Sequence, residues 1–428
     1  MEKEARPRSF VFVRAVWEQM ICRGATRAPR SLFRMSEHKT AATTPADAVH
    51  FETPFGRVSV VASAHDLEST LRRGAFAGQW KDLRYYEISA HGLRSQFEHR
   101  YLVLRDAGTG ESMVQPIFFV DQDLTEGLPP TVRALIDWPR RIFPRWLRLR
   151  MLVAGCSTGE GALDSTQPWA VVTLREALEI YGRASGVALV LLKDFPSSYR
   201  DALAPFANDG YRRVPSMPAC QLELDFASFD EFLQKKIGRV FRQNLRRKFK
   251  KLAAHPPIDM EVVLDITPFV DEVYGLYIQT FERSHFRFEK LTRDFLCGVG
   301  RQMPDRARFF LWRIDGRLVA FALCMLHGDT LYDLNIGLDY AVAFDLHLYF
   351  VTRRDIIQWA VENGVRRYHV GPLNYHPKLH FRMTLAPLDL YARHLSPWIN
   401  PLFKLAVGWL QPARHDPFIA QFPNASEL

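Results

Sequence analysis

The order of predicted elements repeats along this chain, and the repeat limits the possible folds more than any other feature. From residue 56 to residue 225, apolar and polar spacing predicts strand, two helices, three strands, helix, strand, a short helix or loop, and a last strand. The same order returns between residues 258 and 395. Only the order repeats, not the residues. This alternation predicts an α+β (α/β) fold with helices on both faces of each sheet.

Local signals set the boundaries of several elements. Asp315 and Gly316 between two alternating runs predict a tight hairpin. Gly364 predicts the end of a helix over 346–363. Thr173, with Glu176 three residues later, has the spacing of a capping box and predicts a helix over 173–185. A strand over 388–395 is expected to close the second repeat.

The positive charge of the chain is concentrated in one stretch. The chain has 56 Lys and Arg against 47 Asp and Glu, and residues 234–251 contain nine of these cations and no acid. Apolar residues at spacings of three and four predict a helix with one buried stripe: Ile237, Phe241, Leu245, Phe249 and Leu252. The remaining cations form either a solvated face or a surface for a polyanion, such as tRNA, a lipid headgroup or a coenzyme A phosphate.

Other segments bear on location. Residues 131–150 mix arginines with Trp, Phe and Leu, and residues 398–410 are apolar and contain Trp. Such segments either lie at a membrane interface or pack as ordinary amphipathic cover. No run of about 18 apolar residues predicts a spanning helix. The five cysteines lie far apart and predict no disulfide framework. We therefore expect a cytoplasmic protein, with contact at the inner face of the membrane left open.

Three stretches carry a family resemblance. They are Phe229–Lys251 with Asn-Leu-Arg-Arg at 244–247, Leu318–Gly337, and His369–Phe381 with Gly371, Tyr375 and Lys378. Together they resemble the Fem-related group of the GNAT (Gcn5-related N-acetyltransferase) acyltransferases. The likeness covers about residues 180–385, and the N-terminal half is similar in element order only. It implies two tandem GNAT-like domains, each a mixed, largely antiparallel sheet with flanking helices, joined by a basic helix.

The resemblance and the composition together predict five regions. A poorly ordered basic tail covers 1–48, and whether residues 1–34 are translated stays open. The first GNAT-like domain covers 49–228, a basic connecting helix 229–256, and the second GNAT-like domain 257–395. A C-terminal extension covers 396–428.

The resemblance implies an N-acyltransferase that moves an acyl group from acyl-CoA or acyl carrier protein to a primary amine of a small molecule. The strands over 330–337 and 367–370 would splay, and their backbone N–H groups would stabilise the oxyanion. One alternative is an aminoacyl-tRNA-dependent Fem-type transferase acting on a cell-envelope precursor. Another is a non-catalytic binding or membrane-scaffold protein. The glycine-rich coenzyme A loop of single-domain GNAT enzymes is absent after residue 337, and no tightly bound cofactor is expected.

The same resemblance indicates catalytic candidates. Lys378 can hold an anion or stabilise a developing oxyanion. Tyr375 can donate a proton to the leaving group, and Asp333, Asp339 or His347 can accept the amine proton. Each has a structural alternative; for Asp339 it is a turn. The substrate-binding candidates lie on these strands, the turn after them and the basic helix: Arg242, Arg246, Arg247, Tyr332, Asn335, Gly337, Tyr349, Gly371 and Asn374.

Two further motifs are weaker. His369, His376 and His380 fit no zinc spacing, so no metal site is predicted. The glycine-rich stretch Gly155–Gly161 follows a predicted strand, where such loops bind phosphate, but it lacks the lysine of a P-loop. An inert, flexible loop is the other interpretation.

Overall fold

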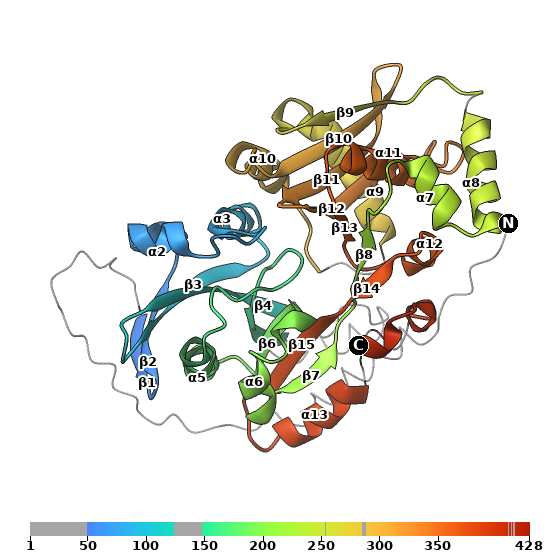
Figure 1. Ribbon diagram of the computed structural model, residues 1–428. Helices are drawn as coiled ribbons and strands as arrows, with labels where there is room; N and C mark the ends of the chain where they lie inside the picture. Colours follow the sequence, from blue (N-terminus) through green and yellow to red (C-terminus); the bar gives the residue numbers. More distant parts are fainter. Residues whose placement is uncertain are drawn as a thin grey trace, which may run out of the picture.

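The computed structural model describes residues 49–123, 148–252, 254–284, 288–409, 411, 413 and 416–428. The expected tail over 1–48 and most of the arginine-rich 131–150 segment lie outside this part of the chain. Two mixed sheets with flanking helices form two units (Figure 1). The predicted α+β class and the pair of similar units are confirmed. None of the helices in the described ranges is long and apolar enough to cross a bilayer.

The first sheet has the order β1-β2-β3-β4-β5-β6-β15-β7. Its strands are β1 Val49–Thr53, β2 Gly56–Val61, β3 Glu98–Asp106, β4 Ser112–Asp123, β5 Arg148–Ala154, β6 Leu189–Pro196, β7 Arg212–Pro215 and β15 Leu388–His394. The second sheet has the order β14-β8-β13-β12-β11-β10-β9. Its strands are β8 Ala219–Glu223, β9 Asp259–Val263, β10 Ala307–Ile314, β11 Arg317–His327, β12 Thr330–Leu338, β13 Arg367–Val370 and β14 Thr384–Ala386. Among the strands of the described residues, only β5–β6 and β12–β13 pair in parallel.

Helices cover these sheets (Figure 1). They are α2 Ser69–Gly74, α3 Leu83–Gly92, α5 Pro168–Ala184, α6 Ala204–Asn208, α7 Phe229–Lys235, α8 Arg239–Leu252, α9 Val270–Arg283, α10 Arg293–Gln302, α11 Leu348–Glu362, α12 Tyr375–His380 and α13 Asn400–Trp409. The turn signals Asp315, Gly316 and Gly364 all have positive φ, as their predicted turns require. The predicted cap at Thr173 is wrong, because α5 begins at Pro168 and the Thr173 hydroxyl donates to the Trp169 carbonyl at 2.7 Å.

Two strands belong to the sheet of the opposite half of the chain, which the sequence pattern did not predict. The 388–395 strand was expected to close the second repeat, but β15 lies between β6 and β7 of the first sheet. In the opposite direction, β8 from the first half pairs with β13 and β14 of the second sheet. The two halves of the chain, before and after residue 228, therefore exchange strands: each sheet contains one strand from the other half. The boundaries of the domains themselves stay a prediction.

The basic connecting segment is two helices rather than one. Ser228 caps α7, where its hydroxyl accepts the Glu231 N–H at 3.1 Å, and α8 starts after Gly238. The predicted apolar stripe is confirmed. Ile237 and Leu245 are buried in the hydrophobic cluster of the second unit, and Phe241, Phe249 and Leu252 pack against it.

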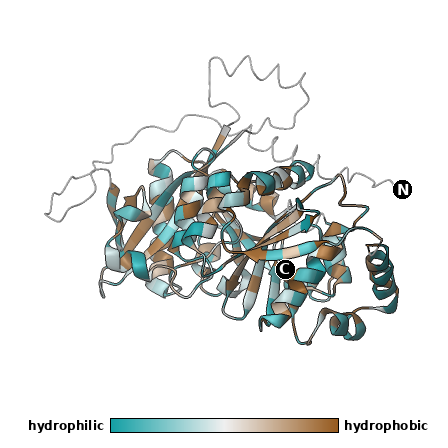
Figure 2. Cartoon of the chain, turned by 90° about the horizontal axis from the view of Figure 1, so that it is seen from above, coloured by the Kyte–Doolittle hydropathy of each residue, from teal (hydrophilic) through white to brown (hydrophobic). Residues whose placement is uncertain are grey.

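A shared hydrophobic cluster joins the two units. It combines first-unit residues such as Tyr85 and Ile88 with second-unit residues such as Phe295 and Phe321. Where α3 meets α10, a Cβ on Gly92 would lie 2.7 Å from the Phe295 Cβ, so the helices approach closely because position 92 has no side chain. Figure 2 shows hydrophobic and hydrophilic residues alternating along the helices and strands, as expected for elements with one buried face.

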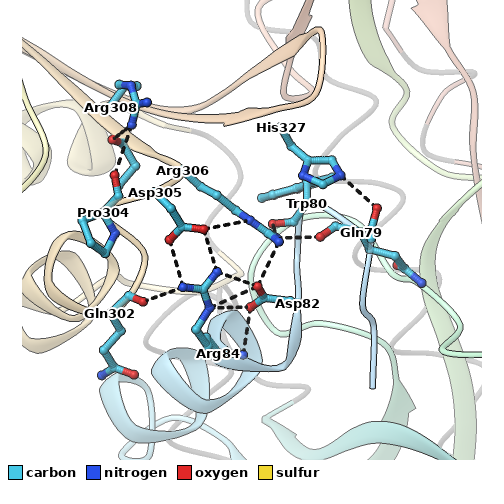
Figure 3. Close-up of polar contacts among 12 residues, drawn as sticks. Gln79, Trp80, Asp82, Arg84, Gln302, Pro304, Asp305, Arg306, Arg308 and His327 are labelled. Atoms are coloured by element: carbon cyan, nitrogen blue, oxygen red, sulfur yellow. Dashed lines mark hydrogen bonds and ion pairs between the residues drawn. The ribbon is translucent and has the colours of Figure 1, made fainter. Parts of the chain in front are cut away.

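Ion pairs border this apolar contact (Figure 3). Arg84 of α3 pairs with Asp82 at 2.7 Å and with Asp305 of the second unit at 2.9 Å. Arg306 pairs with Asp82 at 3.0 Å and donates to the Trp80 carbonyl at 2.8 Å. These contacts fix one unit against the other by both charge and shape.

Candidate functional site

The second sheet opens between β12 and β13. The two strands pair in parallel from Thr330 to Asp333, and the Gly371 N–H donates to the Asp333 carbonyl at 3.2 Å. Beyond that point β12 continues to Leu338. The segment that follows β13 turns away from β12 through Leu373 (φ 71°) and Asn374 (φ 51°) and enters α12. Two successive non-glycine residues with left-handed backbone store strain, which is typical of functional sites. We call the region between residues 334–338 and 371–378 the second wedge.

Lys378 lies inside the second wedge. Its side chain is 3% exposed, its ammonium donates to the Gly371 carbonyl, and it lies 5.5 Å from the centre of the Tyr375 ring. Burial, with a smaller contribution from the nearby Arg353 charge, lowers the pKa of Lys378 to about 8. A buried lysine with this pKa exchanges its proton near neutral pH.

Tyr375 supports the same corner. Its hydroxyl donates to the Pro218 carbonyl at 2.7 Å, which ties α12 to the segment before β8. Burial raises the pKa of Tyr375, so the hydroxyl stays protonated. In this conformation its proton is directed at Pro218 and not at the wedge.

A buried triad of side chains lies behind the wedge. The Arg353 guanidinium of α11 donates to the Asp333 carboxylate and to the Tyr368 hydroxyl, and Tyr368 also donates to Asp333. Asp333 and Arg353 are 3% and 4% exposed. The carboxylate of Asp333 is therefore held in an ion pair and is not free to accept an amine proton.

The charges in this region do not balance when Lys378 is protonated. Arg353 and Lys378 are cationic, whereas the only carboxylate bonded to either is that of Asp333, within the described part of the chain. Burial raises the pKa of the neighbouring Cys220 to about 11, so the thiol stays neutral. The Arg353 Nε is buried and has no hydrogen-bond acceptor among the described residues. A buried excess of positive charge stabilises an anion or a developing oxyanion.

Two other candidates shape the turn after β12. The carboxylate of Asp339 pairs with Arg317 and accepts the Ala341 N–H at 3.0 Å, which is the turn-forming alternative. A Cβ on Gly337 would lie 2.3 Å from the Phe321 ring and 2.8 Å from the Leu276 backbone. Gly337 thus allows close packing of β12 on α9.

The turn over residues 339–347 also occupies its own backbone donors. The Val342 and Ala343 N–H groups donate to the Asp339 carbonyl at 3.1 and 2.8 Å, and the Leu346 N–H donates to the Val342 carbonyl at 3.0 Å. The Tyr340 N–H donates to the Gln279 side chain at 3.1 Å. This turn follows the strand that precedes the coenzyme A loop in the expected fold. Most of its N–H groups are not available to cradle a diphosphate.

The basic segment contributes both structural and exposed residues. The Arg242 guanidinium donates to the Leu233 and Gln234 carbonyls at 3.2 and 2.8 Å, so Arg242 caps the end of α7. Arg246 and Arg247 are exposed. The ring of His347 lies 3.5 Å from the Lys248 ammonium, and burial followed by the Lys248 charge lowers the pKa of His347. His347 therefore faces α8 and not Lys378.

The remaining candidates fall on two sides of β12. The Tyr332 ring stacks on Trp80 of the first unit, with ring centres 4.7 Å apart. Tyr349 is half-buried, and the Arg353 guanidinium lies over its ring, 5.2 Å from the ring centre. Asn335 is half-buried on β12 past the split, and Asn374 is exposed before α12. The structure thus brings Lys378, Tyr375 and Gly371 together and places Tyr349 beside Arg353, whereas Tyr332 belongs to the contact between units.

The glycine-rich loop over 155–161 lies at the equivalent place in the first unit. The Lys193 ammonium donates to the Gly159 carbonyl at 3.0 Å, and the Gly161 N–H donates to the Asp194 carbonyl at 2.9 Å. Lys81, only 2% exposed, donates to the Glu160 carbonyl. The Gly155–Gly161 loop is therefore hydrogen-bonded to β6 and to Lys81, and the expectation of an inert, flexible loop stays a prediction.

Sequence reasoning missed Arg353 and Tyr368. A signal was present, because Arg353 is spaced with the buried Ile357 and Ala360 along one face of α11. An arginine at a core-facing position needs a buried partner. The pattern did not indicate that the partner would be Asp333.

Comparison with known proteins supports the assignment of the second unit. Residues 239–379 match the family model described as "Acetyltransferase (GNAT) domain". A search of curated proteins finds no match. The residues that match the GNAT domain model include β12, β13, Arg353 and Lys378.

Solved structures with a similar fold have low sequence identity. One is FemX, with 13% identity, 78% of this chain and 97% of that chain covered, and a TM-score of 0.49. Another is L-PGS from Bacillus licheniformis, with 15% identity, 62% and 84% coverage, and a TM-score of 0.43. A third is a tandem GNAT protein from the clavulanic acid biosynthesis pathway, with 12% identity, 79% and 99% coverage, and a TM-score of 0.44. TM-scores below 0.5 carry no argument about activity. By the family match, residues 239–379 of this chain are similar to a GNAT acetyltransferase domain.

Proposed function

We propose that this protein is an N-acyltransferase whose transfer reaction takes place in the second wedge. The observation that carries the proposal is the buried Lys378 at the point where β12 and β13 separate, within the segment that matches a GNAT domain. The donor is an acyl thioester and the acceptor is a primary amine. In the first sheet, the corresponding loop over 155–161 is hydrogen-bonded to β6.

The transfer requires one bond to form and one to break. The neutral amine attacks the thioester carbonyl carbon, a C–N bond forms, and the C–S bond then breaks to release a thiolate. The amine loses a proton to solvent, and the thiolate takes one up. The Lys378 ammonium, supported by the Arg353 charge, stabilises the oxyanion of the tetrahedral intermediate. Gly371 and Tyr375 hold the side chain of Lys378 in place.

The turn over 339–347 bears on which thioester is used. Acyl-CoA carries a diphosphate that needs backbone donors, and those of Val342, Ala343 and Leu346 bond within the turn. Acyl carrier protein presents its acyl group on a phosphopantetheine arm without that diphosphate. Of the two expected donors, the turn favours acyl carrier protein.

A second candidate function has one observation in its favour. An aminoacyl-tRNA donor would transfer its aminoacyl group to an envelope precursor, with cleavage of a C–O ester bond in place of C–S. Helix α8 packs next to α11 and α12, and tRNA phosphates could bind its exposed cations. The third possibility, a non-catalytic scaffold, is excluded by any turnover that depends on Lys378.

The test is a transfer assay with acyl-CoA, acyl carrier protein and aminoacyl-tRNA donors and a panel of primary amines. We expect turnover with an acyl thioester and a loss of about 100-fold or more in Lys378→Met, as for removal of one oxyanion donor. Lys290→Met is the matched control, because Lys290 is exposed and lies outside the second wedge. Turnover in which Lys378→Met equals the wild type would disprove the site.

A further inference from the structure

Helix α8 presents a row of unpaired cations to solvent. Arg239, Arg246, Arg247, Lys250 and Lys251 are exposed, and the structure records no ion pair for any of them among the described residues. The two lysines before α8 differ, because Lys235 pairs with Glu231, and Lys236 pairs with Asp225 at 2.6 Å. Like charges on neighbouring turns repel, so this row is stabilised only when an anion lies against it.

Apolar side chains protrude beside this row. Val240 is 82% exposed and Phe344 is 74% exposed. On a helix Val240 shares a face with Arg247 and Lys251, seven and eleven residues further on. Phe344 lies one turn before His347, whose ring is 3.5 Å from the Lys248 ammonium, so the 339–347 turn flanks α8.

Helix α8 is held rigidly in this orientation. Leu245 is fully buried, the Phe241 ring stacks on His380 of α12 at 4.9 Å, and the Arg354 guanidinium of α11 lies 5.0 Å from the Phe249 ring. In Figure 1 the helix lies at the edge of the molecule. Its apolar stripe is already covered, so the exposed side is the one left for a partner.

The combination of charge and protruding apolar groups distinguishes between partners. A nucleic acid neutralises cations through its phosphates and can stack a base on Phe344, but it gains nothing from the exposed aliphatic side chain of Val240. An anionic bilayer attracts each basic residue near its surface and also buries apolar side chains at the headgroup boundary. Asp345, an exposed acid next to His347 on the adjoining turn, offsets a single charge. We infer that the cationic face of α8, together with Val240 and Phe344, docks on an anionic phospholipid surface.

This inference goes beyond the proposed acyl transfer. Because α12 and α11 carry Lys378 and Arg353, a bilayer on α8 would bring the second wedge near the membrane surface. The docking does not require transfer, so each can fail without the other.

The experiment is vesicle co-sedimentation of the full chain. Vesicles of phosphatidylcholine alone are compared with vesicles that also contain phosphatidylglycerol, and unfractionated tRNA is added as a competitor. We expect binding only to the phosphatidylglycerol vesicles, and release by salt. Arg246→Gln with Arg247→Gln should weaken binding roughly 30-fold, from about 1 kcal/mol per basic residue near the surface.

Matched variants separate docking from nonspecific effects. Arg73→Gln with Arg183→Gln removes two exposed charges of the first unit and should leave binding unchanged. Phe344→Ser should weaken vesicle binding, whereas Phe55→Ser, at the turn between β1 and β2, should not. The inference is overturned by vesicle binding that ignores both Arg246→Gln/Arg247→Gln and Phe344→Ser. It is equally overturned by tRNA that binds through Arg246 and Arg247 and is not displaced by phosphatidylglycerol vesicles.

Discussion

At the residue scale, the second wedge is defined by buried charges that the surrounding fold holds close together. Lys378 and Arg353 share one region with a single bonded carboxylate, Asp333. Burial disfavours each charge, and the ion pair offsets that cost only for Arg353 and Asp333. Lys378 is left as the group whose protonation state can change near neutral pH.

The pH dependence of transfer should reveal the role of Lys378. If its ammonium stabilises the oxyanion, the rate should fall as pH rises through about 8, because the buried amine then loses its proton. Arginine stays charged, so Lys378→Arg should remove this fall even if the rate is lower throughout. The measurement is kcat against pH for both proteins. If kcat of Lys378→Arg falls at the same pH as kcat of the wild type, the titrating group is not Lys378.

The stability of the fold should also respond to Lys378. Its pKa is lower in the folded protein than the usual 10.5, so between about pH 8 and 10.5 the unfolded chain binds more protons. The free energy of unfolding contributed by this group therefore rises with pH across that window. Denaturant titrations at several pH values should show Lys378→Met more stable than the wild type below pH 8, with the difference shrinking above it.

The ion pair between Asp333 and Arg353 should contribute to the stability of the fold, and Asp333 should not act as a proton acceptor. Asp333→Asn leaves the buried Arg353 charge without a counter-ion, which costs about 3–5 kcal/mol. Asp333→Leu combined with Arg353→Met removes both charges and should recover most of that loss. Chemical denaturation of the single and double variants measures the difference. A single variant as stable as the wild type would contradict a buried pair.

At the element scale, close contacts between backbone and helix position the wedge. Gly337 lets β12 approach α9, and the left-handed residues Leu373 and Asn374 direct the chain into α12. Helix α8 packs through its stripe against the second unit, so the same element fills a core and exposes a charged row. One amphipathic helix therefore performs a structural role and offers a surface.

Substitution of two neighbouring glycines should have opposite effects. Gly337→Ala places a Cβ against the Phe321 ring and the Leu276 backbone, and such overpacking costs about 1–3 kcal/mol. Gly275→Ala lies within α9 with nothing within 4 Å of its Cβ, and should stabilise by about 0.5–1 kcal/mol. Thermal unfolding of the two variants provides the comparison. A stabilised Gly337→Ala protein would show that α9 can move away from β12.

At the scale of the whole molecule, the exchanged strands tie the two units together. β15 lies between β6 and β7, so the first sheet is incomplete without residues from the end of the chain. The shared hydrophobic cluster and the ion pairs around Arg84 and Arg306 add to this link (Figure 3). We infer that the units fold as one cooperative structure.

Truncation should reveal this dependence. A chain that ends at residue 386 lacks β15, which leaves β7 without a partner and exposes the edge of β6. We expect the shortened protein to lose its cooperative unfolding transition or to aggregate. Circular dichroism melts and limited proteolysis of the truncated and full chains measure this. Two separate transitions in the full chain, each seen alone in a fragment, would contradict a single cooperative structure.

The sequence by itself determined the features that arise from local pattern. Periodicity indicated the stripe of α8, turn residues located the Asp315–Gly316 hairpin, and the count of charges identified the cationic row. A motif resemblance indicated Lys378. The tertiary structure alone decided that β8 and β15 change sheets, that the loop over 155–161 is hydrogen-bonded to β6, and that Asp333 pairs with Arg353. The physical reason is that local spacing encodes which face of an element is buried, whereas the partner of a buried face or charge is chosen by contacts between residues far apart in the chain.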